Sequence, residues 1–100
     1  MGSLITIWWR DIPMQVIARE GRQTAKRVLD KRFQFAVDKA AMNAGKKSYG
    51  DYIEEMRRSE RECGADVEAE ADGELARLEA AYTKPVLHRL IASGGEGDRL

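Results

Sequence analysis

The sequence predicts an α+β domain, in which a short antiparallel β-meander of two to three strands is followed by two to four helices. The first third of the chain is rich in β-branched and aromatic residues that suit strands. From Asp30 onward, apolar residues recur every three or four positions, which is the helical period. Because the strands come first and the helices follow, the pattern indicates an α+β rather than an alternating α/β fold.

The strands are expected at residues 4–10, 14–19 and 24–29. Both alternating sets of residues 4–10 are largely apolar, so this strand should be central or covered on both faces. Asp11-Ile12-Pro13 is expected to break it, because proline donates no hydrogen bond to a ladder. Glu20-Gly21-Arg22 is expected to reverse the chain, since glycine tolerates a positive φ.

The first two helices are expected to begin near Asp30 and Ser48. Asp30 is a suitable N-cap for a helix that ends at Gly45. Ser48, with Asp51 three residues later, resembles a capping box. We predict that the helix after Ser48 continues to Cys63 with one apolar face, formed by Tyr49, Tyr52, Ile53, Met56 and Cys63.

Two further helices are expected at residues 66–82 and 86–92, the second introduced by Pro85. The carboxylates Glu68, Glu70, Asp72 and Glu74 occur at every second position, which spreads them around a helix and predicts a solvated face. The domain is therefore expected to span residues 1–93. Residues 94–100 are glycine-rich and are expected to form a flexible C-terminal tail.

Several short motifs resemble a known family. Trp9-Arg10-Asp11-Ile12-Pro13, followed by Gln15-Val16-Ile17, is similar to the opening of a small bacterial domain family labelled "virulence factor", which includes the domain in conserved virulence factor C. Later motifs match in the same order: Ala25-Lys26-Arg27, Arg32-Phe33, Ala40-Ala41-Met42, Ala80-Ala81-Tyr82 and Leu90-Ile91-Ala92-Ser93-Gly94-Gly95. The resemblance implies a regulatory or supporting role in virulence and names no chemistry.

Composition narrows the setting of the protein. The only cysteine is Cys63, which excludes an internal disulfide and favours a reducing compartment, so we expect a cytoplasmic protein. The longest apolar run is too short to cross a bilayer, and no signal peptide is recognisable, so no membrane association is expected. Residues 1–47 hold ten basic and four acidic residues, a net charge of +6, and the remainder carries −6. Two interpretations stay open: attraction between the two halves, or a basic binding surface.

The sequence contains no convergent catalytic set, so we predict a protein that is not an enzyme and needs no cofactor or metal. His88 is the only histidine, and we interpret it as structural. Cys63, at the expected C-terminal end of a helix, should have a raised pKa and be a poor nucleophile. The carboxylates do not form a metal-binding loop.

The corner between the first two strands is the leading candidate for an interaction surface with a protein partner, including a second copy of the chain. Its residues are Trp8, Trp9, Arg10, Asp11 and Pro13. Adjacent tryptophans on a strand point to opposite faces, so one is expected in the core and the other outward. Tryptophan is enriched at binding hot spots, and arginine beside aromatic rings can bind a carboxylate or phosphate.

Two alternative functions remain. The densest basic run could bind nucleic acid if exposed aromatic rings lay on the same face. This basic patch comprises Arg19, Arg22, Lys26, Arg27, Lys31 and Arg32. The second alternative, an accessory subunit in one-carbon or methyl transfer, is implied only by loose association with the family.

Overall fold

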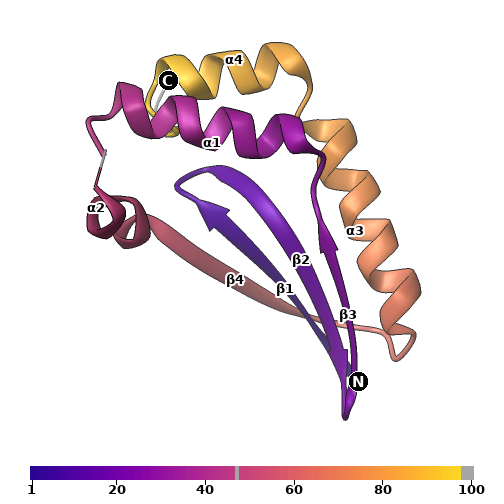
Figure 1. Ribbon diagram of the computed structural model, residues 1–100. Helices are drawn as coiled ribbons and strands as arrows, with labels where there is room; N and C mark the ends of the chain where they lie inside the picture. The colour runs from indigo at the N-terminus through magenta and orange to yellow at the C-terminus, as the bar shows by residue number, and fades with distance from the viewer. Residues whose placement is uncertain (47, 98–100) are drawn as a thin grey trace.

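The computed structural model describes residues 1–46 and 48–97, and four antiparallel strands in them form one sheet (Figure 1). The strands are β1 (Gly2–Trp9), β2 (Ile12–Glu20), β3 (Gln23–Val28) and β4 (Met56–Cys63), in the spatial order β3-β2-β1-β4. The strand with two apolar faces, β1, lies in the middle of the sheet, as predicted. The α+β class is confirmed, and the sheet has one strand more than predicted.

The helices are α1 (Lys31–Asn43), α2 (Tyr49–Glu54), α3 (Val67–Ala81) and α4 (Lys84–Ala92). Figure 1 shows α1 and α4 side by side beyond one end of the sheet, while α3 runs along it and contacts β2 and β3. The predicted caps of α1 are confirmed: the Asp30 carboxylate accepts the Arg32 N–H at 3.1 Å, and Gly45 follows with φ 76°. None of the helices in the described ranges has the length and hydropathy that crossing a bilayer requires.

The prediction of one helix from Tyr49 to Cys63 is wrong. Ser48 does cap α2, accepting the Asp51 N–H at 3.1 Å, but α2 ends at Glu54. The chain then forms β4, which pairs along the whole of β1 from Gly2↔Cys63 to Trp9↔Met56. Backbone pairing with an open strand edge prevails over the local helical spacing, because β propensity depends strongly on tertiary context.

The predicted strand break at Asp11-Ile12-Pro13 is also displaced. The hairpin turn consists of Arg10 and Asp11, and β2 already begins at Ile12. Pro13 pairs with Trp8 at a register shift between Ile7 and Trp8. A β-bulge is one of the few positions in a sheet that tolerates proline, because the ladder is interrupted there.

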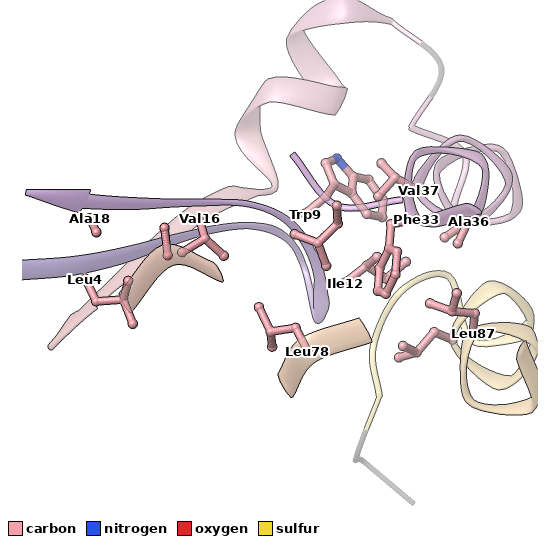
Figure 2. Close-up of a cluster of buried hydrophobic side chains, with 14 of the residues drawn as sticks. Leu4, Trp9, Ile12, Val16, Ala18, Phe33, Ala36, Val37, Leu78 and Leu87 are labelled. Carbon is pink, nitrogen blue, oxygen red and sulfur yellow. The ribbon is translucent and has the colours of Figure 1, made fainter. Parts of the chain in front are cut away.

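The core lies where the hairpin tip, α1, α3 and α4 meet. Figure 2 shows Trp9 beside Val37 and Phe33 of α1, with Leu78 of α3 and Leu87 of α4 in the same cluster. Trp9 is fully buried, and its indole N–H donates to the Tyr52 carbonyl at 2.9 Å. The Trp9 side of the first hairpin corner is therefore part of the core.

We had predicted that the acidic residues of α3 form a plain solvated face, but several of them are paired with arginines. Glu68 and Asp72 pair with Arg27 of β3, and Glu74, only 6 % exposed, pairs with Arg61 and Arg77. Because Arg27 lies in the basic half of the chain and its partners in the acidic half, these contacts favour attraction between the two halves.

Replacing Glu74 with glutamine is expected to lower the free energy of unfolding at neutral pH by about 1–2 kcal/mol, because it weakens the pairing with two arginines. The loss is no larger because both arginines are exposed and solvent screens their charge. The Arg77 hydrogen bond lowers the pKa of Glu74 from its usual 4.5, against the opposing effect of burial. A lowered folded-state pKa stabilises the protein above pH 4.5, and this contribution disappears as the pH falls through the folded-state pKa.

Urea unfolding of the wild type and of Glu74→Gln, followed from about pH 7 down to about pH 3, measures this contribution. The two stabilities should converge at the acid end. Glu68→Gln serves as a control because that carboxylate is exposed, and it should change stability by less. A constant gap between the wild type and Glu74→Gln at every pH would contradict the prediction.

Candidate functional site

The turn between β1 and β2 holds an unusual backbone conformation. Arg10 has φ 52°, and it is the only residue other than glycine with a positive φ in the described ranges. The turn is fixed on both sides, since the Arg10 N–H donates to the Glu55 carbonyl at 3.0 Å and the Asp11 N–H to the Gly95 carbonyl at 2.9 Å. The surrounding chain therefore holds a conformation that costs an L-residue about 1–2 kcal/mol.

The Arg10 side chain is occupied by contacts within the molecule. Its Nε lies 3.1 Å from the Glu55 carboxylate, and its Nη1 donates to the Gly94 carbonyl and the Glu96 carboxylate, both at 3.1 Å. The guanidinium also lies over the Trp9 ring, 5.4 Å from its centroid. The hydrogen bond from Arg10 is the main cause that lowers the pKa of Glu55. These contacts of Arg10 thus stabilise the corner.

Residues 94–97, which we had placed in a flexible tail, are packed against this corner. Gly94 and Gly95 are buried, and the Gly97 N–H donates to the Asp11 carboxylate at 2.7 Å. The rest of the predicted tail, residues 98–100, lies outside the described residues.

Arg57 of β4 joins the corner from the other side. Its Nε donates to the Arg10 carbonyl at 3.0 Å, and its Nη2 lies 3.3 Å from the Asp11 carboxylate. The guanidinium stacks over the Trp8 ring at 4.8 Å from the centroid. Arg57 is about half exposed, so one side of it faces solvent.

The two tryptophans contact different aromatic partners, as expected for adjacent strand residues. Trp9 packs against Tyr52 inside the core, with 5.9 Å between ring centroids. Trp8 is half-buried, contacts Tyr82 edge-on at 6.3 Å, and donates its indole N–H to the Ser59 hydroxyl at 3.0 Å. Of the proposed surface, Trp9 and Pro13 are buried, and Trp8 and Asp11 remain partly accessible.

An open groove of about 490 Å³ lies beside these accessible residues. Its walls come from the hairpin formed by β1 and β2, from β4, and from α3 and α4. It ends at residues 94–97, which we call the C-terminal turn. The lining residues are Trp8, Asp11, Arg57, Ala81, Tyr82, Val86, Arg89, Leu90 and Gly97. We call this feature the corner groove. It combines aromatic and aliphatic walls with two arginines.

Sequence reasoning missed Arg57, Tyr82 and Arg89 as parts of this site. Arg57 falls inside the helix that we had predicted from Ser48 to Cys63, whereas it lies on β4. Tyr82 was expected only as the last residue of the helix at residues 66–82, and it is the C-cap of α3. Only the pairing of β4 with β1 and the position of α4 bring these side chains to Trp8.

The residues considered for catalysis lie apart from the groove. His88 is exposed on α4 and is not among the groove residues. We had predicted Cys63 at the end of a helix, but it is the last residue of β4. Its pKa is raised by burial and by the nearby carboxylate of Glu70. Among residues 1–46 and 48–97, no group of three or more histidine, cysteine or acidic side chains is placed to hold a metal ion.

The basic run is divided among several surfaces. Arg19 and Lys26 are exposed strand residues, while Arg27 is held by Glu68 and Asp72 of α3. Arg32 lies over the Phe33 ring and donates to the Glu79 carbonyl. Arg22 lies at the β2–β3 turn and Lys31 begins α1, so the six residues form no single stripe with exposed aromatic rings.

Comparison with models of protein families shows which family the chain belongs to. A family model described as "Virulence factor" matches residues 7–91, most of the chain. The chain belongs to the virulence factor family. The resemblance of the sequence motifs to this family is thereby confirmed. Comparisons with curated proteins and with solved structures found no match.

The virulence factor match includes almost the whole corner groove. Trp8, Asp11, Arg57 and Tyr82 fall inside residues 7–91, as do the groove residues of α4. Only Gly97 of the lining lies beyond the matched segment. The groove is thus built from the virulence factor domain itself.

Proposed function

We propose that this virulence factor domain is a non-enzymatic accessory protein that acts by binding a protein partner in the corner groove. The observation that carries the proposal is the meeting of Trp8, Tyr82, Arg57 and Arg89 around one open groove. Aromatic residues and arginines are the side chains most enriched at binding hot spots. The lone free cysteine, Cys63, supports a reducing, cytoplasmic setting for this role.

The groove chemistry suits a partner segment that carries a carboxylate next to an apolar side chain. Arg89 is exposed and forms no ion pair with the described residues. Arg57 is already paired with Asp11, so Arg89 is the better placed of the two arginines to meet an incoming carboxylate. An apolar neighbour of that carboxylate would contact Trp8, Val86 and Leu90.

Replacing Arg89 with glutamate is expected to weaken partner binding by about thirtyfold, because a hot-spot contact contributes about 2 kcal/mol. The partner is first identified by affinity purification with the tagged chain from its native host, and its affinity is then measured by calorimetry. Lys84→Glu is the matched control, because Lys84 is exposed on the same helix outside the groove.

Two outcomes would contradict this proposal. Unchanged affinity in both Arg89→Glu and Trp8→Ala would place the binding site elsewhere. A folded His88→Ala/Cys63→Ala double variant that loses the ability to complement a deletion strain would instead indicate an enzyme, since it removes the only imidazole and the only thiol.

A further inference from the structure

The residues on one face of the sheet do not contribute to the core that the helices cover. Residues paired across antiparallel strands point to the same face, so the register defines two sets. Leu4, Ala18 and Ala25 belong to the core that α3 covers. The opposite set, which we call the open face, contains Ser3, Ile5 and Ile7 of β1, Gln15, Ile17 and Arg19 of β2, Thr24, Lys26 and Val28 of β3, and Arg58, Glu60 and Glu62 of β4.

The open face is apolar in its centre and charged at its margins. None of its twelve residues belongs to the core cluster, and Ile7 and Ile17 are not among the partly buried hydrophobic residues that pack against it. Ile5 is only 2 % exposed between its neighbours, Ile7 and Ile17 are half-buried, and Val28 on the edge strand β3 is 71 % exposed. Such a face, apolar inside and polar at the rim, is typical of an interface.

The charges are arranged in rows across the four strands. In the middle row, Lys26, Ile17, Ile5 and Glu60 lie side by side, from β3 through β2 and β1 to β4. The row therefore begins with a cation and ends with an anion, and its two central residues are isoleucines. The rows on either side are Val28-Gln15-Ile7-Arg58 and Thr24-Arg19-Ser3-Glu62.

We propose that the open face binds a second copy of this chain, with the two sheets face to face about a two-fold axis parallel to the strands. The axis lies midway between the two sheets and runs over the line between β1 and β2, which is the centre of each four-stranded sheet. It places β3 over the partner's β4 and β2 over the partner's β1, without shifting the rows. Lys26 of each copy then meets Glu60 of the other, and Ile17 meets Ile5.

The charge pattern selects this axis over the other face-to-face arrangement. A two-fold axis perpendicular to the strands would place each edge strand over itself and oppose Lys26 with Lys26. With the parallel axis, no row opposes two like charges: Val28 meets Arg58, and Thr24 meets Glu62. Like-charge contacts at an interface cost several kcal/mol, whereas opposite charges fix the register.

The size of the face sets the expected strength of the dimer. Four strands spaced about 4.8 Å apart and three rows spaced about 6.8 Å apart cover roughly 20 Å by 20 Å. This is smaller than the usual ~800 Å² per partner of a stable complex, so we expect a weak and reversible dimer. The inference does not depend on the corner groove, and none of the open-face residues lines that groove.

Sedimentation velocity of the full chain from about 1 µM to about 1 mM tests the proposal. The wild type should pass from monomer to dimer. Lys26→Glu alone and Glu60→Lys alone should each weaken association by about tenfold or more, because the two-fold axis repeats the repulsion. Lys31→Glu is the matched control, since Lys31 is an exposed lysine outside the open face, and it should dimerise like the wild type.

Mixing the two single variants, Lys26→Glu and Glu60→Lys, provides the decisive measurement. In a mixed dimer, both contacts between the copies join a glutamate of one copy to a lysine of the other. A one-to-one mixture should therefore dimerise about as well as the wild type, although each variant alone does not. A wild type that stays monomeric throughout the range, or a dimer unaffected by both single changes, would overturn the proposal. Circular dichroism confirms that each variant is folded.

Discussion

Replacing Trp9 with alanine is expected to lower the free energy of unfolding by about 3–5 kcal/mol, the largest effect of any single truncation at the corner. Trp9 is fully buried among residues of α1 and α2, and its indole N–H bonds to the Tyr52 carbonyl. Because a domain of this size is stable by about 5–15 kcal/mol, Trp9→Ala should leave it marginally folded or unfolded.

Trp8 provides the matched comparison, because it has the same side chain one position away. It is half-buried, and its truncation would remove its contacts with Tyr82, Arg57 and Ser59. We expect a loss of about 1–2 kcal/mol and a folded domain. Urea unfolding followed by circular dichroism measures both variants. Equal losses for the two tryptophans would show that the corner does not divide them between core and groove.

Replacing Gly95 with alanine is expected to destabilise the domain by about 2–4 kcal/mol and to displace the C-terminal turn from the corner. Gly95 has φ 94°, and an added Cβ would lie 2.8 Å from the Trp9 ring and 3.3 Å from the Arg10 Cβ. The clash would also strain the hydrogen bond from the Asp11 N–H to the Gly95 carbonyl.

Gly45→Ala separates the collision from the cost of a positive φ. Gly45 has φ 76°, but no atom outside its chain neighbours lies within 4 Å of an added Cβ. We expect this control to cost only about 1 kcal/mol. Thermal unfolding monitored by circular dichroism gives both values. If the two variants lose the same stability, the packing of the C-terminal turn on Trp9 contributes nothing.

Elements with a strong local pattern were predicted correctly from the sequence. The alternating apolar residues of β1 and the spacing of Phe33, Val37 and Ala40 in α1 reflect faces that are buried in the folded chain. Asp30 and Ser48 cap helices through bonds to residues only two or three positions away. Such signals are local, so they are readable without knowledge of the tertiary structure.

The errors arise where a distant partner determines the local structure. β4 is an edge strand that contacts water along most of its length, so Arg57 to Glu62 lack the apolar alternation of a half-buried strand. Charged side chains are typical of such edges, because they prevent pairing with other chains. The corner groove was only half predicted for the same reason. Trp8 and Asp11 were identified, but Arg57 and Arg89 reach them only through the pairing of β4 and the packing of α4.

The place of β4 in the sheet has a consequence for synthesis of the protein on the ribosome. Gly2 pairs with Cys63, so one edge of β1 finds its partner only when the chain about sixty residues further on has been made. Until then, an emerging hairpin of β1 and β2 presents an apolar strand with unpaired backbone groups to solvent. Long-range pairing of this kind slows folding and exposes partly folded chains to aggregation. A nascent chain that stalls before Met56 should therefore depend on chaperones to remain unaggregated. A chain whose β4 has emerged from the ribosome should not.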